Sequence, residues 1–360
     1  MKLIGRLLVG ILLAVNAVFA VLLLLSAYSP YADPQAHPVW ACTGLAFPVF
    51  LVPNVLYLFF WLIVYRRYAL FPLMILIACQ GAIRNYFPIH FFPESSPEEA
   101  IKVVSYNTRG FGSYASHTEE KPNNVLAYLQ QSEADIICLQ EFIWGGKLKK
   151  KDIDYALRKY PYRHYQALNN GGNGLGCYSR YPILSATPIP YESHQNGSIA
   201  YRIKVKDDTL LVVNNHLESY KIKESDVATY QNVIRTPREQ ANSAGARKLA
   251  KKLMESTKIR AAQADAVAEF IAGFDGQGVI VCGDFNDSPI SYAHRKIAEN
   301  LEDAFVRSAN GPGFSYVQNR LYFRIDHILT GRGLRSYQCM VNDSVKASDH
   351  YPIECHVAWE

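Results

Sequence analysis

Two uncharged, strongly apolar runs near the N-terminus constrain the fold of this chain more than any other feature. They span residues 7–32 and 38–65, and a third run of 16 residues covers 68–83. Because about 20 helical residues cross a bilayer, the first two runs are long enough to span one. The third is shorter, but Arg84 can extend its charge to the interface, and aromatic residues follow it. We therefore expect a membrane region at 1–92 with three transmembrane helices, at about 7–28, 43–65 and 68–87.

Two other interpretations of these runs are weaker. Lys2 and Arg6 precede the first run as the basic residues of a signal peptide do, but the run is long for a signal and two more apolar segments follow it. The second and third runs lack the polar face that a buried helix of a water-soluble protein would show. Both observations favour transmembrane helices.

Basic residues predict the orientation of the membrane region. Lys2 and Arg6 precede the first helix, and Arg66 and Arg67 separate the second from the third. Basic loops stay on the cytoplasmic side, so three crossings place the C-terminal part in the periplasm or outside the cell. Arg84 opposes this orientation weakly. We expect a multi-pass protein of the inner (cytoplasmic) membrane.

The chain changes character after a polar linker at 93–100. From 101 to 360 it alternates apolar runs with polar turns and contains one long helical stretch, 218–274, which is typical of an α/β domain. The hydrophobic fraction of 49% excludes a disordered chain, and the formal net charge of +5 does not by itself indicate nucleic-acid binding. The strand-like runs are IKVVSYN, ADIICLQE, GLGCYSR, IAYRIKV, TLLVVNNHL, GVIVCGDFN, FRIDHIL and YPIECHVAW.

Polar side chains lie at or near the ends of six of these segments. Ligand sites of α/β proteins collect at strand ends, where a rigid sheet presents residues from distant parts of the chain. We therefore predict that these segments build one site. Its candidate residues are Asn107, Glu141, Asn215, His216, Asp284, Asn286, Asp326, Asp349 and His350.

Taken alone, several of these residues have an ordinary explanation. Glu141 could be a surface acid, although a carboxylate directly after a buried strand needs a cation or several donors. His216 could be a core or surface histidine, Asn107 a turn residue and Asp326 a salt-bridge acid. The Asp349–His350 dipeptide is common. Together, however, the six segments favour a shared site.

The residue types fit metal-assisted phosphate chemistry. Mg²⁺ prefers oxygen ligands and keeps water molecules for the substrate, and one glutamate with an amide oxygen matches this preference. Aspartates and histidines supply bases for an attacking water, and amides and imidazoles supply donors for the phosphoryl oxygens. Zinc is not expected, because the chain has no HxH or CxxC spacing. We expect Mg²⁺ as the cofactor, with Mn²⁺ as an alternative.

The motifs SYNTRG, LQE, NNHLES, GDFND, RIDHIL and SDHYPI occur in this order. They resemble the motifs of the endonuclease/exonuclease/phosphatase family, which includes DNase I, bacterial sphingomyelinases, inositol phosphatases and deadenylases. The resemblance covers about 100–360 and implies a four-layer α/β sandwich, with two mixed β-sheets flanked by helices. It also implies hydrolysis of a phosphate ester with a divalent metal ion.

The resemblance also implies roles for single residues in metal and phosphate binding. Glu141 matches the metal-binding glutamate of the family, and Asn107 matches the asparagine or aspartate near it. Asp349 is expected beside the same metal. His216 matches a histidine that acts on the phosphate, and Asn286 matches an amide that holds it.

The remaining assignments concern the water and its base. Asp284 matches the aspartate that positions or activates the attacking water, and Asp326 matches a further acid of the site. Asp349 is expected to orient His350, which matches the catalytic histidine of the family. Because strand residues alternate, Phe285 should point into the core while its two neighbours face the site.

Residues 220–258 exceed what the family needs and predict a helical insertion near the mouth of the site. Its basic side chains could hold a polyanion or lie on anionic headgroups, or they could simply cover a solvated helical pair. These residues are Lys221, Lys223, Arg235, Arg238, Arg247, Lys248, Lys251 and Lys252. We expect Arg109, Asn173 and Asn215 to contact the substrate.

These observations lead to one preferred function and two alternatives. The preferred function is a membrane-anchored phosphodiesterase that acts on nucleic acid or on a phospholipid headgroup, with no obligate protein partner. The first alternative is a phosphomonoesterase acting on a nucleotide or an inositol phosphate. The second is a catalytically inactive membrane scaffold, which the complete set of acids and imidazoles disfavours.

Overall fold

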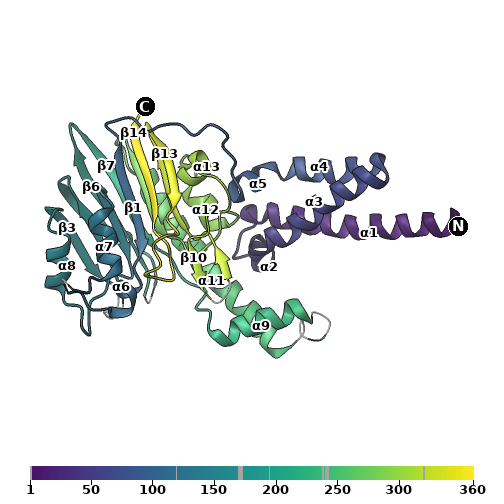
Figure 1. Ribbon diagram of the computed structural model, residues 1–360, viewed down its shortest axis with the longest axis horizontal. Helices are drawn as coiled ribbons and strands as arrows, with labels where there is room; N and C mark the ends of the chain where they lie inside the picture. Colours follow the sequence, from purple (N-terminus) through teal and green to yellow (C-terminus); the bar gives the residue numbers. More distant parts are fainter. Residues whose placement is uncertain are drawn as a thin grey trace.

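The computed structural model describes residues 2–118, 120–168, 173–193, 195–236, 239, 243–318 and 321–360. Two long helices, α1 (Lys2–Ala27) and α3 (Phe47–Val64), extend away from two β-sheets (Figure 1). Between them lie the short α2 (Pro38–Ala41) and the 3₁₀ turns η1 (Ser29–Tyr31) and η2 (Cys42–Ala46). The turn η3 (Arg66–Ala69) then leads into α4 (Leu70–Ala78) and α5 (Gln80–Tyr86).

The number of helices that can cross a membrane is two or three within the described residues. Ile4–Ala27 and Pro38–Val64 are each long and apolar enough. The third predicted span is not one straight helix, because the segment Arg66–Ala78 and α5 meet at an angle of 63°. The pair counts as a third span only if both helices together form one crossing.

Two mixed six-stranded sheets form the centre of the soluble part, with order β13-β14-β1-β2-β4-β3 in the first and β5-β6-β7-β8-β12-β9 in the second. The pairs β1/β2 and β7/β8 are parallel and the others are antiparallel. The strands are β1 (Ile101–Asn107), β2 (Ile136–Gln140), β3 (Tyr162–Ala167), β4 (Gly174–Ser179), β5 (Ile183–Pro188), β6 (Gly197–Val205), β7 (Asp208–His216), β8 (Val279–Asp284), β9 (Glu302–Asp303), β12 (Asp326–Gly331), β13 (Leu334–Val341) and β14 (Ile353–Trp359), with a separate hairpin of β10 (Tyr316–Gln318) and β11 (Leu321–Phe323).

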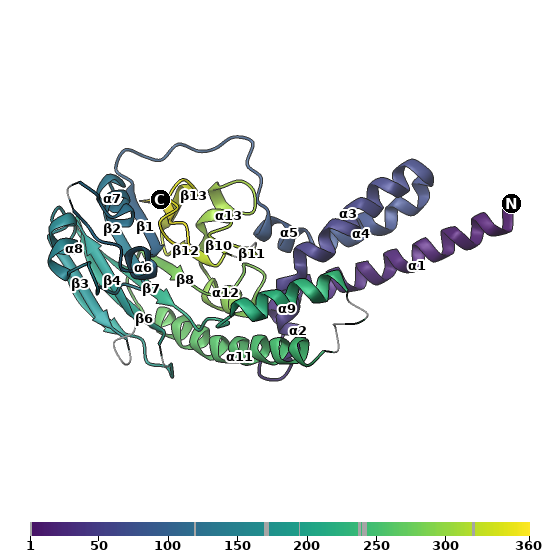
Figure 2. The same ribbon diagram turned by 60° about the horizontal axis from the view of Figure 1, so that its bottom comes forward.

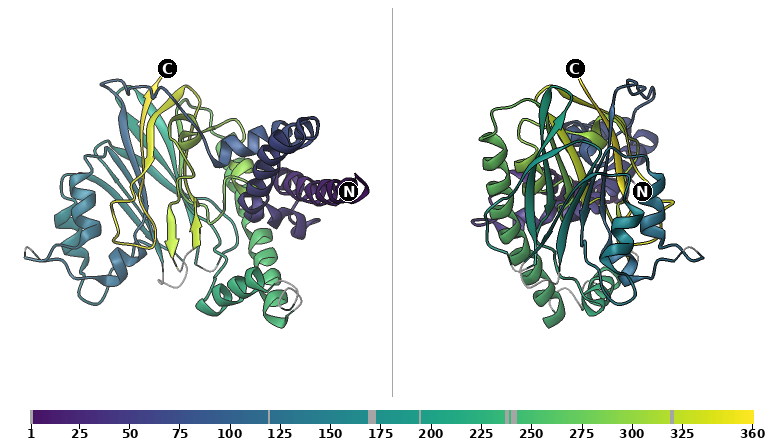
Figure 3. Two further views of the ribbon diagram at one scale, coloured as in Figure 1. Left: turned by 45° about the vertical axis from the view of Figure 1, so that its right-hand side comes forward. Right: turned by 90° about the vertical axis from the view of Figure 1, so that its left-hand side faces the viewer.

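Helices cover the outer face of each sheet and complete the predicted four layers (Figures 1 and 3). The inner faces meet in an apolar core that includes Val103, Cys138, Tyr201 and Cys282. The covering helices are α6 (Arg109–Tyr114), α7 (Asn124–Gln131) and α8 (Lys150–Ala156) on the first sheet and α11 (Ala244–Ala272) and α12 (Tyr292–Ile297) on the second. The short α13 (Ala304–Ser308) instead packs Ala304 and Phe305 into the core between the sheets.

All eight strand-like runs of the sequence form strands, and three longer strands were not predicted. These are β3 and β5, which lie at sheet edges, and β13, which also ends a sheet. An edge strand has one solvated side and needs no continuous apolar run, as the largely exposed β5 illustrates. Periodicity alone therefore could not identify them.

The region predicted as an insertion forms α9 (Glu224–Arg235) and the first half of α11, which continues without a break to Ala272. We call residues 221–258 the arm. Figure 2 shows α9 and the first half of α11 on the side of the α/β domain that carries the N-terminal helices.

The N-terminal helices pack directly on the α/β domain. The side chain of Arg295 donates to the carbonyl of Pro30 at 2.8 Å, and the Arg324 guanidinium donates to the carbonyl of Asn85. Gly44 lies so close to the carbonyl of Ile290 that a Cβ atom would come within 2.0 Å of that oxygen. Because Ile290 closes the loop that follows β8, the N-terminal helices are held near that loop.

Candidate active site

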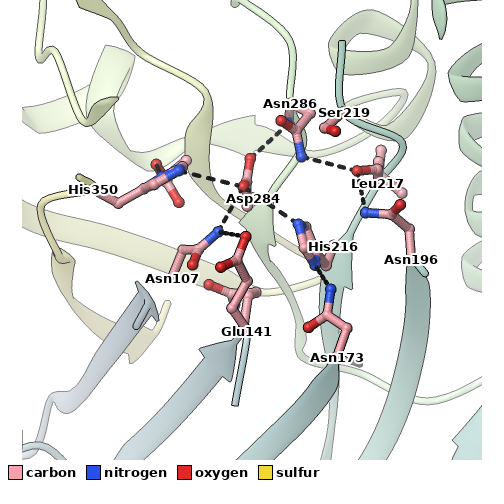
Figure 4. Close-up of polar contacts among 12 residues, drawn as sticks. Asn107, Glu141, Asn173, Asn196, His216, Leu217, Ser219, Asp284, Asn286 and His350 are labelled. Carbon is pink, nitrogen blue, oxygen red and sulfur yellow. Dashed lines mark hydrogen bonds and ion pairs between the residues drawn. The ribbon is translucent and has the colours of Figure 1, made fainter. Parts of the chain in front are cut away.

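Strand register brings three of the predicted residues side by side. His216 pairs with Asp284 across the parallel β7/β8 ladder, and Asp284 pairs with Asp326 across the antiparallel β8/β12 ladder. Asn107 ends β1 on the facing sheet, and Glu141 follows β2 (Figure 4). The site therefore lies where the ends of strands from both sheets meet.

Asp284 is the centre of this group. Its Oδ2 accepts a hydrogen bond from Asn107 Nδ2 at 3.0 Å and lies 3.7 Å from Nε2 of both His216 and His350. Its Oδ1 accepts the backbone N–H of Asn286 at 2.8 Å. Burial raises the pKa of Asp284, and the two histidines only partly offset this effect. Asp284 is thus a carboxylate with increased basicity that faces two imidazoles.

The turn after β8 depends on unusual backbone geometry. Gly283 has φ +131°, and a Cβ atom there would lie 2.0 Å from the carbonyl oxygen of Asn215. Asn286 has a positive φ of 51° and donates its side-chain amide to the carbonyl of Leu217 at 2.9 Å. Phe285 packs in the core as predicted. The glycine therefore permits the close approach of β7 to the strand that carries Asp284.

Asp326, and not the predicted Asp349, contacts the imidazole of His350. The distance from Asp326 Oδ2 to His350 Nδ1 is 2.8 Å, whereas Asp349 lies 3.6 Å from Arg109. Neighbouring residues of an extended segment point to opposite sides, so the side chain of Asp349 points away from the imidazole of His350. Burial disfavours the charged form of His350, but Asp326 and Asp284 outweigh it and raise the pKa of His350 to about 10.

His216 has the opposite protonation state. Asn173 Nδ2 donates to His216 Nδ1 at 3.0 Å, so the ring proton lies on Nε2 and points toward Asp284. Burial lowers the pKa of His216, although Asp284 opposes the shift, and the ring is therefore neutral near pH 7. The site thus combines one charged and one neutral histidine.

Asn173 and Asn215 do not have side-chain amides free for the predicted substrate contacts. Asn173 also donates to the carbonyl of Gln195 at 2.9 Å and accepts the N–H of Gly174 at 2.7 Å, so it positions His216. Asn215 accepts from Ser198 Oγ at 2.6 Å and donates to the carbonyl of Cys282 at 3.1 Å. It is fully buried in the sheet, because alternation along β7 turns it away from the face that carries His216.

Asn214 is a residue that the sequence reasoning missed. It accepts from Gln140 Nε2 at 2.6 Å and donates to the carbonyls of Leu139 and Gly176, both at 3.1 Å. These bonds join the two sheets directly below the site. The signal was present, because Asn214 and His216 are two residues apart and must share one face of the strand.

A second group that was not predicted holds the loop after β8. Asp287 lies 2.9 Å from Arg260 Nε and accepts from Tyr220 Oη at 3.2 Å. The Arg260 guanidinium also lies 4.1 Å from the centre of the Tyr220 ring. Arg260 is fully buried, so the pair is shielded from solvent, and it connects the residues that flank the arm to the loop after β8.

The acids beside Asn107 suit a divalent cation. Glu141 Oε1 lies 3.4 Å from Asn107 Nδ2, and burial raises the pKa of Glu141, with Asp349 adding to the shift. Crowded carboxylates of this kind are stabilised by a cation, and oxygen donors fit Mg²⁺ or Mn²⁺. Asn107 Oδ1 accepts the N–H of Arg109, so Asn107 presents its amide nitrogen to the acids instead of the predicted oxygen ligand.

A further set of possible ligands lies next to these acids. Asp284, Asp326 and His350 offer ligand atoms within 4.8 Å of one another. Among the described residues, the second carboxylate oxygen of Asp326, Oδ1, is buried without a hydrogen-bond partner. An orphaned acceptor of this kind is compatible with a cation or a protonated ligand at the site.

Two sequence profiles match separate parts of this chain. A sequence profile described as the endonuclease/exonuclease/phosphatase family matches residues 104–350, and a profile described as a domain of unknown function matches residues 9–86. Comparison with curated proteins finds no match.

Three solved structures illustrate the structural likeness. D. rerio TDP2 complexed with a single-strand DNA product is 15% identical with a TM-score of 0.50, covering 72% of this chain and 100% of that one. The human Nocturnin catalytic domain with bound sulfate is 16% identical with a TM-score of 0.49, and the match covers 76% of this chain and 100% of that one. An endonuclease/exonuclease/phosphatase family protein from Bacteroides thetaiotaomicron is 16% identical with a TM-score of 0.49, and the match covers 75% of this chain and 100% of that one. At these identities the TDP2 likeness supports the fold alone.

Proposed function

Because the chain belongs to the endonuclease/exonuclease/phosphatase family, we propose that it is a membrane-anchored, divalent-metal-dependent phosphodiesterase. Its substrate is a nucleic acid or the headgroup of a phospholipid. The observation that carries the proposal is the convergence of Asn107, His216 and His350 on the single carboxylate of Asp284. A structural acid has no need of two imidazoles at equal distances.

In this function Asp284 accepts a proton from the attacking water. Its raised pKa makes it a better base than an exposed carboxylate. His350 donates its Nε2–H as a cation, and His216 donates its Nε2–H as a neutral ring. Both donors lie beside the base, where they can stabilise the negative charge that grows on the phosphoryl oxygens. Asp326 keeps His350 charged and oriented.

The metal would be held by the carboxylates of Glu141 and Asp349. When bound there, Mg²⁺ or Mn²⁺ supplies a Lewis acid that draws charge from a phosphoryl oxygen. Arg109, 3.6 Å from Asp349, is about half exposed and can reach a substrate phosphate. Asn107 supports the cluster by donating to both Glu141 and Asp284.

We also propose that the catalytic domain faces the periplasm or the outside of the cell. α1 begins, and α3 ends, at the end of the helical bundle farthest from the sheets (Figure 1). Lys2 and Arg6 therefore lie toward the same end as Arg66 and Arg67, and the positive-inside rule assigns that end to the cytoplasm. A C-terminal alkaline phosphatase fusion should be active in intact cells, and an active cytoplasmic reporter instead would reverse the orientation.

The activity is tested with the full-length protein in lipid nanodiscs, with Mg²⁺ or with EDTA. The substrates are DNA and RNA oligonucleotides, phospholipids with different headgroups, and simple phosphomonoesters. We expect metal-dependent release from a diester, lost in Asp284→Asn and retained in Asp154→Asn, a surface acid in ion pairs with Lys150 and Arg163. Release from monoesters alone would assign a phosphomonoesterase, and Mg²⁺-independent release would remove the metal from the proposal.

A further inference from the structure

The arm carries an excess of positive charge that the rest of the chain lacks. Residues 221–258 contain nine basic and four acidic side chains, a balance of +5 that equals the formal net charge of the whole protein. The remaining residues therefore contain equal numbers of basic and acidic side chains. Arg238, one of the nine, lies outside the described residues.

Much of this charge is available for an external partner. Lys252 is paired with Asp226 at 2.6 Å, but Lys251, whose side chain is 73% exposed, has only a loose contact of 3.7 Å with Glu255. Within the described part of the chain, no acid lies within ion-pair distance of three further side chains on α9 and α11. These exposed side chains are Arg235, Arg247 and Lys248.

The arm is built against the segment that enters the membrane. Cys42 Sγ, inside the apolar span Pro38–Val64, lies 3.5 Å from Thr257 Oγ1, and Gln35 donates to the carbonyl of Lys258 at 3.0 Å. Figures 1 and 2 show α9 and the start of α11 beside the ends of the helices that adjoin the soluble domain. The basic arm thus lies at the level where lipid headgroups would begin.

We propose that the arm lies on the anionic phospholipid headgroups of the membrane in which the chain is anchored. This inference rests on the membrane anchoring that we proposed above. Each basic residue near an anionic bilayer surface contributes about a fivefold change in the binding equilibrium. The attraction decays over about one Debye length from the surface. The three unpaired residues Arg235, Arg247 and Lys248 together supply about a hundredfold preference for an anionic over a neutral surface.

A polyanionic substrate is the competing partner for the arm, and the contacts favour lipid. A nucleic acid would need the basic side chains to line the approach to Asp284. Among the described residues, the contacts between this region and the loop after β8 are those of Tyr220 and Arg260, which flank the arm, with Asp287, and α9 lies on the side that carries the N-terminal helices. An arm bound to lipid would thus be connected to the loop after β8 through the buried contact between Arg260 and Asp287.

The test places an environment-sensitive fluorophore on α9 of the full-length protein. Asn232→Cys is exposed, whereas Cys42 is partly buried and the other six native cysteines are buried, and the unsubstituted chain measures background labelling. We expect a blue shift in nanodiscs that contain phosphatidylglycerol relative to pure phosphatidylcholine. The shift should disappear in high salt and in the triple variant Arg235→Gln/Arg247→Gln/Lys248→Gln.

The matched control neutralises a basic run elsewhere on the catalytic domain, Lys149→Gln/Lys150→Gln/Lys151→Gln, and should retain the shift. Asp284→Asn should also retain it, which separates the arm from the proposed activity. Equal emission in neutral and anionic nanodiscs would overturn the inference. A shift that occurs only on addition of an oligonucleotide would assign the arm to nucleic acid instead.

Discussion

The carboxylate of Asp326 lies 2.8 Å from Nδ1 of His350, while Asp349, the neighbour of that histidine in sequence, faces Arg109. The two aspartates therefore have separable functions. Asp326 maintains the charge and orientation of an imidazole, and in the proposed function Asp349 would hold the metal together with Glu141.

Replacing Asp326 should reduce turnover more than metal affinity. Asp326→Asn removes the charge that favours the protonated form of His350, and loss of a charged donor in a site of this kind costs about 10²- to 10⁴-fold in kcat. Asp349→Asn should instead raise the Mg²⁺ concentration needed for half-maximal activity. Steady-state rates measured over a Mg²⁺ titration distinguish the two. Equal effects of both variants on kcat would contradict this division of roles.

Glu141→Gln should weaken metal binding. The change removes one carboxylate from a crowded acidic cluster while it preserves the shape of the side chain. We expect at least a tenfold weaker apparent affinity for Mg²⁺ by calorimetry, together with a lower rate at limiting metal. Glu133→Gln, a surface acid paired with Lys159 and Arg180, is the control. An unchanged metal titration would exclude Glu141 from the site.

Asn173→Ala should impair catalysis without removing any group that contacts the substrate. The variant loses the donor that places the proton of His216 on Nε2, so the ring can rotate or change tautomer. We expect a decrease in kcat of about 10- to 100-fold with little change in KM. Asn124→Ala, at an exposed helix position, should leave kcat unchanged. An effect on KM alone would show that Asn173 binds substrate after all.

Gly44→Val should loosen the junction between the membrane region and the catalytic domain. The added side chain would collide with the carbonyl of Ile290, and overpacking of this kind costs about 1–3 kcal/mol. We expect a lower unfolding temperature by tryptophan fluorescence. Gly10→Val is the matched control, since a Cβ atom at Gly10 meets nothing within 4 Å. Equal unfolding temperatures for the two variants would show that the junction is not a packed contact.

Acid should destabilise the domain through His294. Burial lowers the pKa of this residue below its ordinary value of 6.5, His327 adds to the shift, and Asp303 opposes it. The unfolded chain binds a proton near pH 6.5 that the folded chain does not, so this contribution to stability is present above that pH and is lost below it. The unfolding temperature should fall less between pH 7 and pH 5 in His294→Gln than in the native protein. His37→Gln, at an exposed position, should show the native slope.

Much of the architecture follows from local sequence. The uncharged length of 7–32 and 38–65 identifies helices fit for a bilayer, and the apolar runs identify all the inner strands, because both signals depend only on neighbouring residues. The polar residues at the strand ends identify the site for the same reason. The edge strands β3 and β5 and the bend between α4 and α5 have no comparable local signal.

Local sequence predicts which residue types gather at the site, whereas their pairing depends on tertiary structure. Asp326 and His350 are 24 residues apart, and Asn173 and His216 are 43 apart. Whether such residues meet depends on the register of strands and the path of loops, and the hydrophobic periodicity of the sequence predicts neither. Alternation along β7 likewise separates Asn215 from His216 once the buried face of the strand is known. The sequence shows which residue types lie at the strand ends, whereas the contacts between them arise from the packing of segments that are distant in the chain.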